Sequence, residues 1–242
     1  MKFLWFLPNT FTFLNLFFGC IAVIFGVKGD LNSLVVFVLL GLVCDFLDGF
    51  FARILNVKSK IGVQLDSLSD LVTFGLTSSI VMFTLLSNSN YIIESNSNSY
   101  IRLIPYLSFL IAIASSYRLA KFNLDNHDSH FNGLPTPANA LLIIFLPYVF
   151  EIDFLSNYVT FLQNSFNLIF IIIISSYLLI SNLEMPSLKL KGFFTTRNNF
   201  NGFNNRDIFL IISGSLLIGF KLAAFPIIII IYILLSLFRI KF

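Results

Sequence analysis

Residues 44–70 read CDFLDGFFARILNVKSKIGVQLDSLSD, and long apolar runs lie on both sides of this stretch. It carries four of the twelve acidic residues of the chain, namely Asp45, Asp48, Asp66 and Asp70. A carboxylate close to hydrocarbon costs free energy unless a partner compensates its charge. Four of them in one short stretch therefore require an explanation in terms of what they bind.

The composition predicts a membrane protein. Apolar residues make up 57% of the 242 residues and charged residues only 11%, which is too little polar surface to cover a globule in water. Several runs approach the roughly 20 apolar residues that cross a bilayer as a helix, and the alternating pattern of a membrane barrel is absent. We expect about eight membrane helices, near 10–27, 32–52, 64–86, 101–122, 137–154, 158–181, 207–223 and 225–239.

These helices form one all-α, polytopic membrane bundle in our interpretation. No repeat or linker divides the chain, so residues 1–242 are expected to be a single domain. Within it we expect a core of six helices over about 8–182 and a C-terminal helix pair over about 207–240.

The basic residues indicate the orientation, because short cytoplasmic loops collect Lys and Arg. With the N-terminus inside, only Lys28, Arg102 and Lys221 fall on the outer side. The cytoplasmic side then receives Lys2, Arg53, Lys58, Lys60, Arg118, Lys121, Lys189, Lys191, Arg197, Arg206, Arg239 and Lys241. We expect an integral protein of the inner (cytoplasmic) membrane, with both termini and the acidic stretch on the cytoplasmic side. The net charge of +3 suits anionic lipid headgroups and requires no nucleic acid.

The spacing of the aspartates predicts a metal site. Asp45 and Asp48 stand three residues apart and Asp66 and Asp70 four, so each pair shares a helix face. A short basic turn joins the two helices as a hairpin and places the pairs opposite each other. Arg53 alone cannot balance four carboxylates, whereas two divalent cations can. Oxygen ligands without His or Cys favour Mg²⁺ or Mn²⁺ over zinc.

Small residues border these carboxylates. Gly41, Asp45, Gly49 and Ala52 lie on one stripe of the first helix, and Gly62 precedes Asp66 by one turn on the second. Positions without bulk beside charged groups leave room for a ligand. The alternative is that Gly and Ala only allow close helix packing.

The stretch resembles a known family. Asp45-x-x-Asp48-Gly49-x-x-Ala52-Arg53, then Gly62, Asp66 and Asp70, match every fixed position of the CDP-alcohol phosphatidyltransferase signature. The resemblance implies that the aspartates bind two divalent metals that hold the diphosphate of a CDP-linked lipid. It also implies that Asp45, Gly49, Ala52, Arg53 and Gly62 bind the nucleotide, and that Asp70 takes the proton of the acceptor hydroxyl. Family members are commonly homodimers, and we expect the same here.

Further segments resemble the bacterial phosphatidylserine synthase branch of that family. These are LPNTFTFLNLFFGC at 7–20, DSLSDLVTFG at 66–75, RLAKFN at 118–123 with GLPTP at 133–137, and SNLEMPSLKLK at 181–191. The resemblance implies transfer of a phosphatidyl group from CDP-diacylglycerol to L-serine. Arg118, Lys121 and Asn123 are then candidates for binding the acceptor or the lipid phosphate, since a zwitterion needs both a cation and an acceptor.

Other interpretations stay open. Arg118 and Lys121 are alternatively membrane anchors, and the acceptor is alternatively glycerol 3-phosphate or an inositol phosphate, or the donor an archaeal-type lipid. A divalent-cation transporter is an alternative of another class, although its carboxylates would lie near the bilayer midplane. The segment with Asp125, His127, Asp128 and His130 is interpreted as a solvated loop, and Lys189, Lys191 and Arg197 as headgroup ligands.

Overall fold

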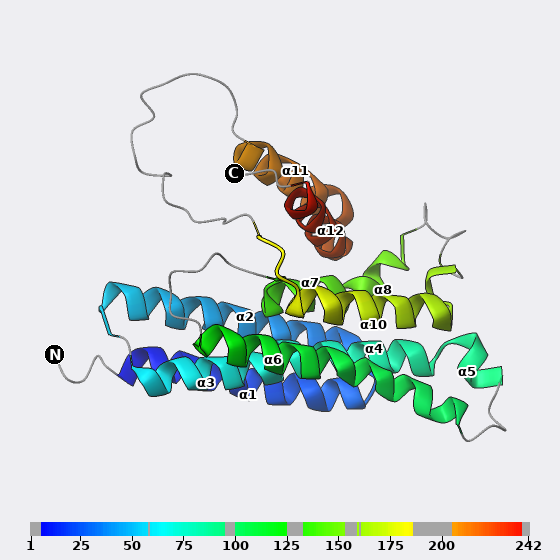
Figure 1. Cartoon of the computed structure of the whole chain (residues 1–242), viewed down its shortest axis with the longest axis horizontal. Coiled ribbons are helices and arrows are strands. Elements are labelled where there is room, and N and C mark those ends of the chain that lie inside the picture. Colours follow the sequence, from blue (N-terminus) through cyan, green and yellow to red (C-terminus); the bar gives the residue numbers. More distant parts are fainter. Residues whose placement is uncertain are drawn as a thin grey trace.

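The computed structural model describes residues 6–57, 59–94, 100–124, 133–152, 159, 161–185 and 205–238. The described chain is helical, which confirms the all-α fold (Figure 1). Its elements are α1 (Leu7–Val27), α2 (Leu31–Ile54), α3 (Lys60–Asp70), the π-helix η2 (Leu71–Leu76), α4 (Thr77–Ser87), α5 (Asn90–Glu94), the 3-10 helix η3 (Ile101–Phe109), α6 (Leu110–Leu124), α7 (Thr136–Ile144), α8 (Leu146–Val149), α10 (Ser165–Ile180), α11 (Asn205–Phe220), the 3-10 helix η5 (Lys221–Ala223) and α12 (Ala224–Leu237).

The N-terminal helices form the layer that carries the acidic stretch. α1 packs along α2, and α3, η2 and α4 follow one another and pack against α1. In Figure 1 these helices and α6 run along the long axis of the molecule, with α7 and α10 against them and α11 and α12 beyond α7. The hairpin predicted between the helices of the acidic pairs is therefore present as α2 and α3.

Local sequence explains where these helices begin and end. Gly29 adopts a positive φ of 79° after α1, and Asp30 caps α2 by accepting hydrogen bonds from the backbone N–H and the hydroxyl of Ser33. Asn56, at φ 51°, follows the end of α2, and Ser59 caps α3 by accepting from the N–H of Gly62. Local residues thus determine where the helices of the two acidic pairs end and begin.

Five helical stretches of the described residues are long and apolar enough to cross a membrane. Four of them match predicted spans, and they cover Leu7–Val27, Leu31–Ile54, Lys60–Ser87 and Ile101–Leu124. The fifth, Asp207–Leu237, covers the last two predicted spans. It turns at Lys221, whose φ is 49°, and the rings of Phe209 and Tyr232 lie 6.3 Å apart, so α11 and α12 form a hairpin.

The predicted count of eight membrane helices is not confirmed. Where spans were expected at 137–154 and 158–181, α7 ends at Ile144, α8 has only four residues and α10 has 16. Pro147, at the start of α8, has no N–H to continue the hydrogen bonding of α7, which explains the interruption.

The side-chain distribution suits a bilayer. A buried apolar cluster includes Leu34, Phe74 and Ile143, whereas Phe17, Phe166 and Ile218 are more than half exposed. Large exposed apolar side chains on several helices are unfavourable in water and match lipid contact. The structure therefore supports an integral membrane protein.

Candidate active site

The carboxylates of the acidic stretch converge from two helices. Asp45 and Asp48 project from α2 and Asp66 from α3, and one oxygen of each lies within 4.8 Å of the others. Asp70 lies one turn beyond Asp66, is 8% exposed, and contacts the carboxyl of Asp45. The arrangement gathers four carboxylates in a poorly hydrated place.

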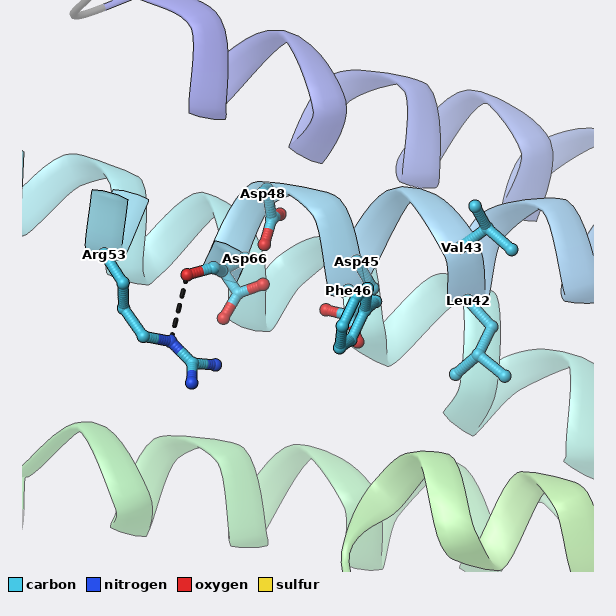
Figure 2. Close-up of a pocket in the computed structure, with 8 residues that line it drawn as sticks. Leu42, Val43, Asp45, Phe46, Asp48, Arg53 and Asp66 are labelled. Atoms are coloured by element: carbon cyan, nitrogen blue, oxygen red, sulfur yellow. Dashed lines mark hydrogen bonds between the residues drawn. The ribbon is translucent and has the colours of Figure 1, made fainter. Parts of the chain in front are cut away.

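A pocket of about 630 Å³ opens beside three of these carboxylates. One part of its wall is polar and comprises Asp45, Asp48, Gly49, Arg53 and Asp66, and the other part is apolar and comprises Leu42, Val43 and Phe46. Figure 2 shows the labelled acidic side chains between Arg53 and the apolar residues. A pocket lined in this way suits a ligand that has both a charged part and an apolar part.

Arg53 folds back on its own helix. Its Nε donates a hydrogen bond to the carbonyl oxygen of Gly49 at 3.0 Å (Figure 2). Among the described residues, a Cβ on Gly49 would meet only Nη2 of Arg53, at 3.6 Å, so this glycine leaves space on the pocket side. Of the predicted nucleotide residues, Asp45, Gly49 and Arg53 line this pocket.

The other small residues lie elsewhere. Ala52 and Gly62 are not among the residues lining this pocket, and a Cβ on Gly62 would lie 2.9 Å from Ser59 Oγ at the start of α3. A Cβ on Gly41 would lie 2.6 Å from Thr73 Cγ2 and 3.0 Å from Asn15 Oδ1. Gly41 therefore serves helix packing, the alternative that the sequence left open, rather than space for a ligand.

The acidic site fits a hard divalent cation. The donors are all carboxylate oxygens, and Asp66 Oδ1 is buried without a hydrogen-bond partner among the described residues. Burial of an ionised oxygen without a partner costs free energy unless a cation or a hydrogen-bond donor of a ligand contacts it. Asp45, Asp48 and Asp66 form a cluster that could hold a metal ion, with Asp70 next to it.

α1 contributes contacts that the sequence did not reveal. Thr12 Oγ1 donates to Asp48 Oδ2 at 2.8 Å, and Asn15 Nδ2 donates to Asp70 Oδ1 at 3.3 Å. Neither Thr12 nor Asn15 is among the site residues predicted from the sequence. The available signal was their spacing, because residues 12 and 15 share a helix face.

The predicted acceptor residues lie on α6, and each of them contacts different partners. Arg118 Nη1 donates to Thr136 Oγ1 at 2.9 Å, and its charge lies near Asp70. Lys121 Nζ lies 3.3 Å from Asn182 Oδ1. Asn123 hydrogen-bonds Gln64 and Ser67 of α3. Arg118 thus approaches the acidic cluster, whereas Asn123 fastens α6 to α3.

Arg118 does not behave as a membrane anchor. Its Nε is buried and, within the described part of the chain, has no hydrogen-bond partner. An anchoring arginine extends its head to water or lipid headgroups instead. A guanidinium near Asp70 whose Nε–H is buried without a partner among the described residues is available to an anionic ligand group.

Some sequence predictions lie outside the described residues. They concern the loop with Asp125, His127, Asp128 and His130, the basic residues Lys189, Lys191 and Arg197, and the cytoplasmic assignments of Lys2, Lys58, Arg239 and Lys241. The side chain of Arg206 lies outside the described atoms as well.

Residues 5–183 match the family model described as CDP-alcohol phosphatidyltransferase. The chain belongs to the CDP-alcohol phosphatidyltransferase family. The match includes the acidic hairpin, α1 and the acceptor candidates on α6, and it ends before the hairpin of α11 and α12. This family uses divalent metal ions, in agreement with the donor set of the acidic cluster.

Curated relatives carry related names. A CDP-diacylglycerol–serine O-phosphatidyltransferase of Helicobacter pylori strain J99 is 29% identical over 191 residues, which are 77% of this chain and 74% of the relative. The enzyme of that name from Bacillus subtilis strain 168 is 27% identical over 189 residues, 76% of this chain and 92% of the relative. An archaetidylserine synthase of Methanothermobacter thermautotrophicus is 30% identical over 190 residues, 77% and 72% of the two chains. The protein is therefore a transferase of this family.

Proposed function

We propose that the protein transfers the phosphatidyl group of CDP-diacylglycerol to the hydroxyl of L-serine and releases CMP, with two divalent cations, Mg²⁺ or Mn²⁺, held by Asp45, Asp48, Asp66 and Asp70. The observation that carries the proposal is the convergence of three of these carboxylates within 4.8 Å beside a pocket with polar and apolar walls. The names of the three relatives support serine as the acceptor, since each of them refers to serine.

The donor is an amphiphile, and the pocket wall suits it. Its diphosphate belongs near the carboxylate end, where bound cations would neutralise charge on the attacked phosphorus and on the departing CMP. Its glycerol and acyl part belongs beside Leu42, Val43 and Phe46, of which Val43 and Phe46 are more than half exposed. The nucleotide is assigned to the small-residue side, by Gly49 and Arg53, with Ala52 and Gly62 as further nucleotide residues by resemblance.

The reaction forms one phosphorus–oxygen bond and breaks another. The serine hydroxyl oxygen attacks the phosphorus that bears diacylglycerol, the bond from that phosphorus to CMP breaks, and the hydroxyl proton needs an acceptor. Asp70 is assigned as that acceptor, because it is a buried carboxylate at the edge of the cluster and lies near Arg118. Its remaining oxygen, Oδ2, is the one not engaged by Asn15.

The acceptor is assigned to the side of the cluster that faces α6. Arg118 offers a buried N–H to the serine carboxylate, or alternatively to the lipid phosphate. Lys121 is assigned a second contact by resemblance, and Asn123 holds α6 against α3 through Ser67. The assignment of Arg118 follows from its position near Asp70, and those of Lys121 and Asn123 follow from the family resemblance and their place on the same helix.

The site is assigned to the cytoplasmic surface of the inner membrane, with both chain termini on that side, because Arg53 and Lys60 flank the turn that follows α2. A homodimer formed through membrane helices is expected by family resemblance.

The test is release of CMP from CDP-diacylglycerol by the purified protein in detergent with Mn²⁺. L-Serine, glycerol 3-phosphate and an inositol phosphate are supplied in turn, and CDP-archaeol replaces the donor in a parallel series. CMP release that depends on L-serine, with phosphatidylserine as the product, supports the proposal. Release with glycerol 3-phosphate alone contradicts the acceptor assignment, and uptake of Mn²⁺ into proteoliposomes without CMP release supports a transporter instead.

A further inference from the structure

The face of α1 that meets the acidic hairpin is polar and buried. Thr12 is 3% exposed and Asn15 is 0% exposed, and Gly19 follows them on the same face. Buried polar side chains in a membrane helix are costly unless their hydrogen bonds are made inside the protein. This face therefore makes specific contacts rather than facing lipid.

Those contacts go to one carboxylate of each acidic pair. Thr12 Oγ1 donates to Asp48 Oδ2 on α2 at 2.8 Å, and Asn15 Nδ2 donates to Asp70 Oδ1 on α3 at 3.3 Å. Each donor engages one oxygen of its carboxylate, Oδ2 of Asp48 and Oδ1 of Asp70, and so limits the directions in which the second oxygen can lie. Both donors are neutral, so they orient the carboxylates without cancelling the charge that a cation needs.

The backbone of α1 is fixed at the same two residues. Ser69 Oγ donates to the carbonyl oxygen of Thr12 at 3.1 Å, and Thr73 Oγ1 donates to that of Asn15 at 3.0 Å. Gly19 allows this approach, because a Cβ there would lie 2.9 Å from Thr73 Cα. The two donors are thus held against α3 and η2 by backbone contacts as well as through their own side chains.

Gly41 completes the arrangement. The carbonyl oxygen of the Asn15 side chain is buried without a hydrogen-bond partner in the described chain, and it faces Gly41 of α2. A larger residue at 41 would displace it, since an added Cβ would lie 3.0 Å from this oxygen. Asn15 keeps its amide N–H₂ toward Asp70 only if this space is preserved.

We infer that Thr12 and Asn15 are positioning residues of the metal site, which orient Asp48 and Asp70 so that carboxylates from two helices meet the cations in one geometry. The inference rests on the proposed metal-binding function. Partners of this kind around metal ligands change metal affinity by about 10- to 100-fold when they are removed.

The test is Mn²⁺ binding to the full chain in detergent without substrate, measured from the electron paramagnetic resonance signal of free Mn²⁺. Thr12→Val keeps the shape of the side chain and removes the hydroxyl, and is expected to weaken Mn²⁺ binding at least about tenfold. Thr12→Ser restores a hydroxyl and is expected to recover most of the affinity. Asn15→Leu is expected to weaken binding similarly, with Asn15→Ser as a smaller replacement if the leucine variant does not fold.

Ser175→Ala is the matched control, since Ser175 Oγ donates a buried interhelical hydrogen bond to Asn139 Oδ1 at 2.7 Å, on helices that carry no acidic ligand. It is expected to lower the thermal unfolding temperature and to keep the Mn²⁺ affinity. Thr12 and Asn15 variants that bind Mn²⁺ as tightly as the unmodified chain overturn the inference, and so does an equal loss in Ser175→Ala. Failure of the unmodified chain to bind Mn²⁺, with Asp66→Asn no different, contradicts the metal-binding function itself.

Discussion

Arg118 Nη1 donates a hydrogen bond to Thr136 Oγ1 at 2.9 Å, and this bond joins α6 to the first residue of α7. Thr136 follows Gly133, whose φ of 79° brings its N–H to the carbonyl oxygen of Leu183 after α10. The GLPTP turn therefore positions the partner of Arg118. This arrangement holds the guanidinium in one orientation beside Asp70.

Arg118→Lys is expected to raise the KM for L-serine about tenfold or more, because lysine keeps the charge and loses the planar set of donors that pairs with a carboxylate. The measurement is steady-state CMP release with serine and CDP-diacylglycerol varied separately. Ser116→Ala is the control, because its hydroxyl donates to the carbonyl of Ile113 on the same helix. A rise confined to the KM for CDP-diacylglycerol would instead place Arg118 at the lipid phosphate.

Asp66→Asn is expected to lower both Mn²⁺ binding and CMP release more than about 100-fold, because an amide cannot replace an ionised ligand of a hard cation. Asp45→Asn and Asp48→Asn are expected to behave alike, since the three carboxylates share one cluster. Asp30→Asn is the control on the opposite end of α2, where the carboxylate only caps the helix. Any of the three cluster variants that keeps full activity would contradict the metal assignment.

Asp70→Asn tests the proton acceptor. If Asp70 takes the hydroxyl proton, kcat is expected to fall at least about 100-fold even at saturating Mn²⁺, because the amide has no basic oxygen. Mn²⁺ affinity is measured on the same sample. Turnover close to normal with unchanged Mn²⁺ affinity would show that another group accepts the proton.

The acidic hairpin was predictable because its contacts are local in sequence. The i,i+3 and i,i+4 spacings, the Asn56 turn and the Ser59 cap define two helices whose acidic faces meet, and the structure brings them together as expected. The hydrogen bond from Arg53 to the carbonyl oxygen of Gly49 also joins residues four apart on one helix.

Contacts between distant segments were not predictable. Thr12 meets Asp48 across 36 residues of sequence, and Asn123 meets Ser67 across 56, so both depend on how helices pack rather than on any local pattern. The spacing of residues after Asp70 does not predict the π-helix at Leu71–Leu76 either. The sequence predicted that Gly41 leaves room for a ligand. In the structure Gly41 faces Asn15 and Thr73 of neighbouring helices, and such a contact between distant segments has no local signal.

Gly19→Ala is expected to destabilise the protein by about 1–3 kcal/mol, because the added Cβ would collide with Thr73 and force α1 away from η2. Gly214→Ala on α11 is the matched control, since no described residue lies within 4 Å of its added Cβ and alanine favours a helix. Thermal unfolding in detergent measures both. Equal stability of the two variants would mean that α1 and η2 are not in close contact.

Asp30 gives an expected pH dependence of stability outside the membrane-spanning segments. The hydrogen bonds from the hydroxyl and then the backbone N–H of Ser33 lower the pKa of Asp30 below its ordinary value of 3.8. Because the folded pKa is depressed, the unfolded chain binds this proton more readily. The stabilisation is fully present above the ordinary value and is lost as the pH falls through the lower folded pKa.

Asp30→Asn removes this carboxylate and keeps a side chain that can cap α2. The unfolding temperature of the unmodified chain is therefore expected to exceed that of Asp30→Asn near neutral pH, and the difference is expected to shrink as the pH falls below the ordinary pKa of 3.8. Taking the difference between the two proteins cancels the titration of the other carboxylates. Ser33→Ala, which removes the strongest hydrogen bond to Asp30, is expected to reduce the same pH-dependent difference. A gap between Asp30→Asn and the unmodified chain that stays constant from neutral to acid pH would contradict the role of the ionised carboxylate as the cap of α2.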